Sequence, residues 1–345
     1  MHDLIVVGGG AVGLFLSKEF AKKGKSVLLL ERKKEIGQKL CSGLVSSNIL
    51  NYIPKDDFGF FLEKEINGAK LWIEKSPFFF KGKAFLFDRN KFDIYLKEEA
   101  EKYGVKILTE ESISNISEKE DFVEISSTTG SIFRGKILAG CDGAVSLIAR
   151  NVNLPQQKKL LLGLIVFSEK KKDVKEDFVE LFFSKKFSGF FAWKIPRKKS
   201  VEWGIALKKD KNPREKLEIF LKEKKIPYKD IKAALIPYFP IKKTITKRVF
   251  LCGDSAGQIK PYTGGGLVYG FSCAKIASNT IDNFENPNLE EYEKKWRKFL
   301  MKEIRTGDLF RKFYSLPNFA KKIGLSLIRT RQKLDQDKPT SIFRF

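Results

Sequence analysis

A chain of 345 residues with 42% hydrophobic and 31% charged residues can bury one or two sizeable cores and is too apolar for a disordered protein. The formal net charge of +24 predicts attraction to nucleic acid, an anionic membrane face or an acidic partner. A solvated basic surface without any partner explains that charge equally well. The one histidine, His2, lies at the terminus, which excludes histidine-based nucleophiles and histidine-rich metal sites.

The four cysteines are scattered and form no CxxC pair, so we expect neither a disulfide framework nor a metal site. Any chemistry then belongs to a bound cofactor. No apolar run reaches the ~18 residues that a membrane-spanning helix needs. The chain opens on a strand-like run without a basic leader. We therefore expect a cytoplasmic protein, and a peripheral position on the inner membrane face stays open.

The N-terminal region reads as a βαβ opening. Residues 3–8 predict a buried strand, a helix follows to about residue 23, and the run SVLLLER predicts a second strand. Residues 33–80 have a less regular pattern. Residues 88–104 have helical spacing of apolar side chains with Asp88 as N-cap, and VKILTE predicts another strand.

The middle of the chain predicts β-structure. The stretch DFVEISSTTGSIFRGKILAGCDG predicts a hairpin followed by another strand. From about residue 155 to 245, Lys-rich turns separate the strand-like runs LLLGLIVF, DFVELFF, GFFAWKIP and VEWGIALK. This pattern predicts an inserted, mostly antiparallel sheet.

The chain then returns to a buried strand, RVFLCGD, a Gly-rich loop and a helix. Asn288 is expected to cap a long basic helix. One apolar stripe of that helix holds Leu289, Tyr292, Trp296, Phe299, Leu300 and Ile304.

The first strand and helix carry a dinucleotide signature. G-x-G-x-x-G occurs as Gly8, Gly10 and Gly13, and Glu31 ends the second strand. The glycines allow a tight turn, close approach of a pyrophosphate and close helix–strand packing, and the acid suits a ribose hydroxyl. The helix N-terminus then faces the phosphates. A chance glycine turn is the competing interpretation.

Two later segments, GCDGAVSLIAR (140–150) and RVFLCGDSAGQIKPYTGGG (248–266), resemble flavoprotein signatures of the glutathione-reductase-like superfamily, in its hydroxylase-like branch. The resemblance implies FAD as cofactor, with Asp254 on the ribityl chain and Gly264, Gly265, Gly266 and Leu267 at the pyrimidine edge. It also places Arg89 beside the cofactor and Ile113 near the adenine. The remaining cofactor contacts that we expect are Val12, Arg32, Asp142 and Gly143. Asp142 with Gly143 could instead form only a turn, and Arg89 could be a surface residue.

The chain also resembles the geranylgeranyl reductase family. QKLCSGLVS, with Cys41, Ser42 and Gly43, resembles the family's segment beside the flavin. The family's Y-x-W-x-F-P motif followed by V-G corresponds to FAWKIP and Trp203-Gly204. Two departures are Phe191 in place of the tyrosine and a chain shorter than typical members.

This resemblance implies hydrogenation of isolated C=C bonds of prenyl chains in membrane lipids or their precursors, with hydride from flavin N5. Phe191, Trp193, Pro196 and Trp203 are expected to line the apolar substrate cavity. The proton source could be Cys41, Tyr262 or water, and Cys41 could equally be a buried spacer. No second G-x-G-x-x-G occurs, so an external electron donor, ferredoxin-like or a reduced nicotinamide, must dock transiently.

Several alternatives stay open. FAWKIP also matches the second half of the W-x-W-x-I-P motif of flavin-dependent halogenases, and hydroxylases share the flavin signatures. An electron-transfer flavoprotein is less suitable because clustered cysteines are missing. A nucleic-acid-binding protein rests on charge alone, and we expect no nucleic-acid partner. The stretch FAKKIGLSLIRTRQK could lie on an anionic membrane or pack as a solvated helix.

The fold class that these signals predict is α/β. We expect a Rossmann-like FAD-binding domain of the glutathione-reductase-like type with an inserted, mostly antiparallel substrate sheet and a C-terminal helical segment. The FAD-binding domain comprises residues 1–50, 81–154 and 246–285. The substrate domain comprises 51–80 and 155–245, and the basic helical segment comprises 286–345.

Overall fold

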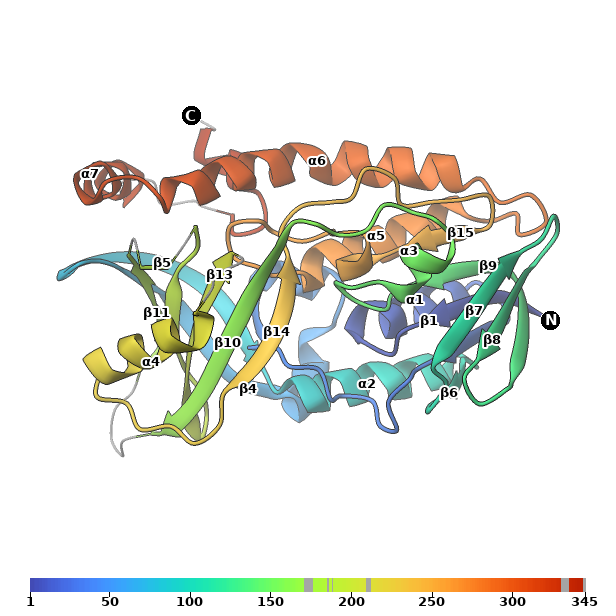
Figure 1. Cartoon of the computed structure of the whole chain (residues 1–345), viewed down its shortest axis with the longest axis horizontal. Helices are drawn as coiled ribbons and strands as arrows, with labels where there is room; N and C mark the ends of the chain where they lie inside the picture. The colour runs from blue at the N-terminus through green and yellow to red at the C-terminus, as the bar shows by residue number, and fades with distance from the viewer. Residues whose placement is uncertain (171–175, 185, 188, 209–211, 330–334, 344–345) are drawn as a thin grey trace.

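The structure is a computed structural model that describes residues 1–170, 176–184, 186–187, 189–208, 212–329 and 335–343. Two sheets lie side by side along the molecule (Figure 1). Within these described residues, the first sheet has seven strands and the second has eight. This arrangement confirms the predicted α/β class with a second, mostly antiparallel sheet.

The first sheet has the order β6-β2-β1-β9-β8-β7, with β15 also paired to β9. Strands β6, β2, β1, β9 and β15 are mutually parallel, whereas β7, β8 and β9 form an antiparallel meander. The strands are β1 (His2–Val7), β2 (Val27–Leu30), β6 (Lys106–Leu108), β7 (Ile113–Glu118), β8 (Val123–Ser127), β9 (Ile132–Gly140) and β15 (Val249–Leu251).

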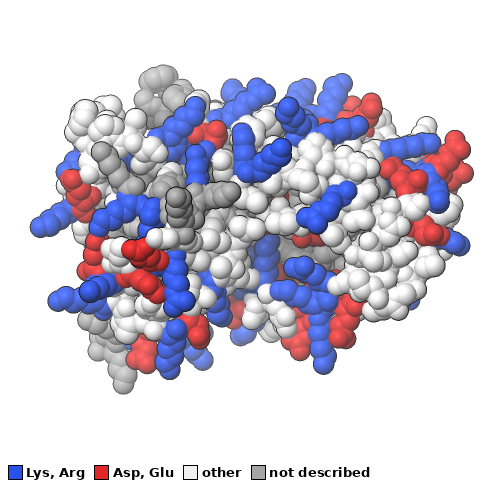
Figure 2. Space-filling view, viewed as in Figure 1, with Lys and Arg blue, Asp and Glu red and all other residues white. Residues whose placement is uncertain are grey.

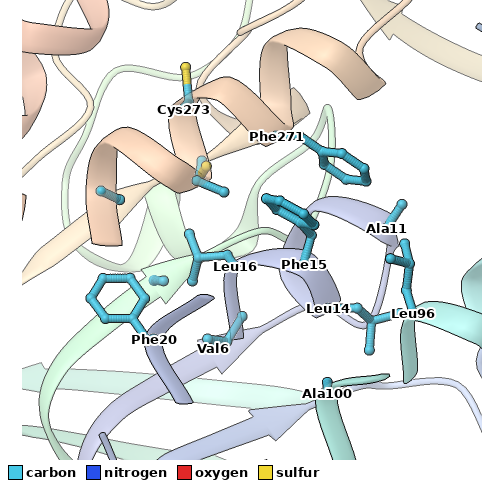
Figure 3. Close-up of a cluster of buried hydrophobic side chains, with 14 of the residues drawn as sticks. Val6, Ala11, Leu14, Phe15, Leu16, Phe20, Leu96, Ala100, Phe271 and Cys273 are labelled. Carbon is cyan, nitrogen blue, oxygen red and sulfur yellow. The ribbon is translucent and has the colours of Figure 1, made fainter. Parts of the chain in front are cut away.

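Both faces of this sheet are buried. Along β1, Leu4 and Val6 point into one core cluster, and Ile5 and Val7 point into the other, as the two-residue period of a strand requires. On the first face, α1 (Ala11–Ala21) packs against α5 (Leu267–Thr280) and α2 (Arg89–Lys102). Figure 3 shows this contact, where Phe15 of α1 stacks on Phe271 of α5 with ring centroids 4.2 Å apart.

The second sheet has the order β14-β10-β13-β12-β11-β4-β5-β3, and all its described strand pairs except β11–β4 are antiparallel. Its face toward α4 (Pro213–Glu223) and its face toward α7 (Asn318–Arg329) hold separate apolar clusters. The strands are β3 (Leu44–Ser46), β4 (Leu62–Ile73), β5 (Ser76–Phe87), β10 (Leu160–Glu169), β11 (Phe178–Phe183), β12 (Ala192–Pro196), β13 (Ser200–Lys208) and β14 (Lys232–Pro237).

The long helix α6 (Leu289–Phe313) runs along the top of both halves in Figure 1. The Asn288 side chain accepts a hydrogen bond from the Glu291 amide, which confirms the predicted cap. After α7, residues 335–343 return to the body and include the short helix η4 (Pro339–Phe343), which packs on α6. The remaining short helices are η1 (Ser47–Asn51), η2 (Lys55–Phe60), α3 (Leu147–Asn151) and η3 (Gly253–Ser255).

Four sequence expectations need correction. Residues 62–87, within and just beyond the segment described as irregular, form the hairpin β4–β5 with twelve residues in each strand. The predicted extra strand after the β8–β9 hairpin is β9 itself, which is long enough to pair with β8 and β15 at different positions. Helix α4 interrupts the run of sheet strands. Phe299 of α6 is 54% exposed and lies outside the buried stripe.

Candidate active site

The turn between β1 and α1 requires glycine at two positions. Gly8 has φ +113°, and a Cβ atom there would lie 2.4 Å from the Cys141 carbonyl oxygen. A Cβ on Gly13 would lie 2.0 Å from the Gly8 carbonyl oxygen. Backbone atoms cannot yield at such distances, so α1 meets the sheet as closely as a dinucleotide fold demands.

Two helices begin without a side-chain cap on the same side of the first sheet. Gly10 and Gly266 are the N-caps of α1 and α5, and neither supplies a side-chain acceptor. By contrast, side chains of Asp88, Ser146 and Asn288 cap α2, α3 and α6. Uncapped helix N-termini favour negative charge through free N–H groups and the helix dipole.

Glu31 lies at the end of β2 next to this turn. Its carboxylate accepts hydrogen bonds from the Gly9 amide at 2.6 Å and the Lys33 amide at 3.0 Å. Arg32 beside it is exposed. The Val12 side chain of α1 packs against Gly253 and Gly270, where no Cβ atom occupies the space. This contact joins α1 to the later Gly-rich segment.

Asp254 lies near the start of α5. Its Oδ1 atom would be 2.9 Å from a Cβ on Gly266, and its Oδ2 atom forms a 2.9 Å ion pair with Lys39. The Asp254 carboxylate raises the pKa of Lys39. Gly264, Gly265, Gly266 and Leu267 are all partly exposed, so this glycine loop can contact a ligand.

Arg89, the first residue of α2, is buried and pairs with Asp93 at 2.7 Å. Burial alone would lower the pKa of Arg89, but the neighbouring Asp93 and Cys41 raise it. Arg89 is therefore not a surface residue, and it brings a permanent positive charge to Cys41. The Arg89 Nε atom and the Asp93 Oδ2 atom are buried without a hydrogen-bond partner in the described part of the chain.

Asp142 and Gly143 form the turn after β9. The Asp142 carboxylate accepts hydrogen bonds from the Ser146 hydroxyl at 2.7 Å and the Ile148 amide at 3.1 Å, and burial raises its pKa. Gly143 has φ +92°. These contacts hold the start of α3. Ile113 begins β7 and is buried in the core of the first sheet.

An aromatic cluster, defined here as Phe190, Phe191, Trp193 and Tyr314, lies on the α7 side of the second sheet. Phe190 stacks on Phe191 with centroids 4.2 Å apart, and Tyr314 contacts both rings edge-on. The ring of Phe190 lies 3.9 Å from a Cβ built on Gly264. The cluster therefore borders the glycine loop.

The other two expected substrate contacts lie differently. Pro196 ends β12 and is buried opposite Val201. Trp203 lies on the opposite face of the sheet, where it packs with Phe220 of α4 and donates to the Ser168 hydroxyl at 3.1 Å. The structure thus does not bring Trp203 together with Trp193, because neighbouring strands pair Trp203 with Lys194 instead.

Tyr262 precedes the glycine loop and contacts Gly307 of α6. Its hydroxyl donates to the Gln336 carbonyl oxygen in the C-terminal segment. Burial raises the pKa of Tyr262 well above its ordinary value. Cys41, in contrast, is exposed and adjoins Arg89.

Sequence reasoning missed several side chains of this region. Lys39 pairs with Asp254, Lys260 forms a buried pair with Asp337, and Glu202 of β13 accepts from the Ser42 hydroxyl. A single carboxylate inside the apolar run VEWGIAL was a usable signal for Glu202. Nothing in the sequence indicates the partner of Asp337.

These residues fit FAD. The glycine turn leaves room for a pyrophosphate, the two uncapped helix N-termini suit anionic groups, and the Glu31 and Asp254 carboxylates suit hydroxyls. Among the described residues, no cluster of histidine, cysteine and acidic side chains could hold a metal ion. No described helix has both the length and the apolar character needed to cross a bilayer.

Known proteins share this organisation. Residues 6–52 match the family described as NAD(P)-binding Rossmann-like domain. An uncharacterised protein of Methanocaldococcus jannaschii is 30% identical, over 91% of this chain and 84% of that protein. Digeranylgeranylglycerophospholipid reductase 2 of Methanothermobacter thermautotrophicus is 28% identical, over 90% of this chain and 87% of the relative.

Solved structures share the fold. A geranylgeranyl bacteriochlorophyll reductase-like protein from Thermoplasma acidophilum superposes with a TM-score of 0.87 at 19% identity, covering 99% of this chain and 95% of its own. The flavin-dependent brominase Bmp2 superposes with a TM-score of 0.78 at 16% identity, covering 99% and 97%. The halogenase alternative is therefore a related branch with the same fold, while the curated relatives at 25–28% identity are named reductases. The chain belongs to the geranylgeranyl reductase family of FAD-dependent oxidoreductases.

Proposed function

We propose that this enzyme uses FAD to hydrogenate isolated C=C bonds of geranylgeranyl chains in a membrane lipid or its precursor. The observation that carries the proposal is the position of the aromatic cluster, which borders the glycine loop at the start of α5 through Phe190 and Gly264. A prenyl chain lying on this cluster would have its double bonds next to the flavin edge.

The residues around this junction suit an apolar chain. Each CH₂ group moved from water into an apolar site contributes about 0.8 kcal/mol. Phe191 and Trp193 carry no charge and are 5% and 8% exposed, so a prenyl chain would have to part the cluster to reach their rings. The Trp193 indole N–H donates to Glu202 at 2.9 Å. The cluster therefore offers the chain apolar contact without an unpaired polar group.

Bound FAD supplies the hydride from N5. The Gly266 N-cap and the amides of α5 would stabilise negative charge on the reduced ring, and Arg89 would add a fixed positive charge beside it. Glu31 would hold the ribose. Asp254 would accept a hydrogen bond from a hydroxyl of the ribityl chain while it stays paired with Lys39.

Cys41 Sγ is the better of the two side-chain proton sources. It is exposed at the site and adjoins Arg89, which can hold the thiol in place. The Tyr262 hydroxyl donates its hydrogen bond to a backbone carbonyl of the C-terminal segment, and its raised pKa opposes release of that proton. We therefore propose Cys41 as the donor, with Tyr262 as a structural residue.

The test is anaerobic incubation of the FAD-loaded enzyme, reduced by dithionite, with a geranylgeranyl glycerolipid in detergent. The expected result is a lipid mass gain of two hydrogens for each bond reduced. The Cys41→Ala variant should bind FAD normally and lose most of the rate. If wild-type enzyme leaves the lipid unchanged while the lipid stimulates oxygen consumption in air, the monooxygenase alternative replaces this proposal.

We further propose that α7 rests on an anionic membrane face. Phe319 and Ile323 lie one helical turn apart and are 69% and 59% exposed, and the partly exposed Lys322 adjoins Ile323. Lys and Arg side chains are spread over the face drawn in Figure 2 among fewer acidic ones. Each basic residue near anionic lipid contributes about 1 kcal/mol of binding.

Flotation with vesicles containing phosphatidylserine tests this contact. Phe319→Asp with Ile323→Asp should lose binding, whereas the control change Ile219→Asp, at a 42% exposed position of α4, should not. Equal binding of both variants would show that α7 does not make the contact.

The electron donor would be an external protein or nucleotide. The net charge of +24 suits an acidic, ferredoxin-like protein and a phosphate-bearing reduced nicotinamide alike.

A further inference from the structure

A buried polar network connects the flavin-side segment 39–43 with the strand that carries Trp193. At its centre is Glu202 of β13, whose side chain is fully buried. Glu202 Oε1 accepts from the Ser42 hydroxyl and from Trp193 Nε1 at 2.9 Å. Glu202 Oε2 accepts from Arg197 at 3.0 Å. One carboxylate therefore ties the β12–β13 hairpin to the loop that holds Ser42.

Arg197 continues the network to the other side of the same loop. Its NH1 atom donates to the Ser42 carbonyl oxygen at 2.8 Å, and its NH2 atom donates to Glu63 at 2.8 Å. Burial alone would lower the pKa of Arg197, but Glu63 and Glu202 raise it. Ser42 is thus held by both its side chain and its backbone.

The next residue is fixed in a different way. Gly43 has φ +76°, and a Cβ there would lie 2.1 Å from the Phe87 carbonyl oxygen. Its own carbonyl oxygen accepts from the Phe87 amide at 3.0 Å. Ser42 and Gly43 leave the segment little freedom, so the orientation of Cys41, one residue earlier, depends on these contacts.

Stability alone does not account for a buried carboxylate in this sheet. Replacing a buried ion pair by apolar side chains of similar volume is often neutral or stabilising. The network instead couples two parts of the active site, because the same Oε1 atom binds the loop serine and the tryptophan of the aromatic cluster.

We propose that Glu202, together with Arg197, is a positioning residue. It holds Cys41 and Trp193 at fixed positions relative to each other, on the two sides of the reacting double bond. This inference rests on the proposed reductase function and deepens it. Neither residue need touch the substrate. Their effect passes through Ser42 and through the indole of Trp193, and a misplacement of about 1 Å at a reacting group can lower a rate about 100-fold.

Glu202→Gln is the informative change. The glutamine keeps one acceptor for Ser42 and Trp193, but it turns an NH₂ group toward Arg197, which has only donors there. Ser42→Ala removes the loop contact and leaves Glu202 with Trp193 and Arg197. The matched control is Glu180→Gln, because Glu180 accepts from an indole, Trp72 at 2.6 Å, and from Lys194 within the same sheet.

The expected result is a kcat lowered about 10- to 100-fold in Glu202→Gln and Ser42→Ala, with a smaller effect on KM and with FAD retained. The alkylation rate of Cys41, followed by peptide mass analysis, should change several-fold in both variants. Glu180→Gln should leave kcat and alkylation unchanged.

Ser42→Ala decides the question alone if Glu202→Gln does not fold. The proposal is overturned if the foldable variants match Glu180→Gln in both kcat and alkylation of Cys41. If wild-type enzyme reduces no prenyl lipid, the proposed function fails by itself. The alkylation rates and the visible circular dichroism of bound flavin then still decide whether the network positions the loop.

Discussion

Replacing Asp337 by asparagine removes the negative partner of a buried lysine at the base of the glycine loop. Asp337 and Lys260 lie 2.6 Å apart, with side chains 5% and 9% exposed. The Ser46 hydroxyl and the Asn48 amide also donate to Asp337, which lies in the returning segment after α7. The backbone of Lys260 is hydrogen-bonded to Gly264 and Gly265, so the pair supports the glycine loop that we propose as a flavin contact.

The expected loss is large. Leaving one member of a buried pair without its partner typically destabilises a protein by about 3–5 kcal/mol. Asparagine can still accept from Ser46, so the lost charge is the main change. Urea unfolding at neutral pH should therefore show a loss near that range for Asp337→Asn. Glu223→Gln, which breaks the exposed pair with Lys186, should lose less than about 1 kcal/mol.

The pair also predicts a pH dependence. Burial alone would raise the pKa of Asp337, but Lys260, Ser46 and Asn48 lower it below its ordinary value. A carboxyl with a depressed folded-state pKa stabilises the fold above its unfolded pKa, and that stabilisation is lost as the pH falls through the folded value. The difference between wild type and Asp337→Asn should shrink in acid. A difference below about 1 kcal/mol at neutral pH would mean that the Asp337–Lys260 pair does not stabilise the fold. The same would follow if Lys260→Met failed to recover stability in the Asp337→Asn background.

Three further predictions concern the cofactor and the sheet. Gly13→Ala should abolish copurified FAD, because its Cβ would meet the Gly8 oxygen at 2.0 Å. The ratio of flavin to protein absorbance measures this loss, and a yellow variant would contradict the glycine-turn assignment. Asp254→Ala should weaken FAD binding about tenfold or more in a fluorescence titration, as expected for loss of a charge-assisted hydrogen bond, and unchanged affinity would remove Asp254 from the site. Gly204→Ala should destabilise the fold by about 1–3 kcal/mol in urea unfolding, because its Cβ would lie 2.4 Å from the Trp193 ring. It should also raise the KM for lipid. No change in either quantity would mean that the indole is free to move.

Local rules were enough for the β1–α1 opening and for two helix caps. The strand, glycine turn and helix at residues 2–21 follow from hydrophobic period and from glycine stereochemistry, both of which act over a few residues. The caps Asp88 and Asn288 also accept the bonds that their positions predict. These features depend on residues that are close in sequence, so the sequence alone predicts them.

The rest depends on contacts between distant segments. The β4–β5 hairpin has two register irregularities and carries Phe residues on both faces, with Phe79 47% exposed. Its sequence therefore shows no clean alternation of apolar and polar residues. Trp203 lies in a motif-like context, but strand pairing turns it to the α4 face. Asp337 meets Ser46 across 291 positions of sequence, and no local pattern encodes such a pair.

In the proposed function, the flavin gives its electrons to a prenyl double bond at the aromatic cluster. The most direct measurement is a single turnover without oxygen, in which the photoreduced FAD-loaded enzyme is mixed with a geranylgeranyl lipid while absorbance is followed. The oxidised-flavin bands should return, and the lipid should gain two hydrogens per flavin oxidised. If the flavin stays reduced until air is admitted and the lipid mass does not change, the protein is not a prenyl reductase.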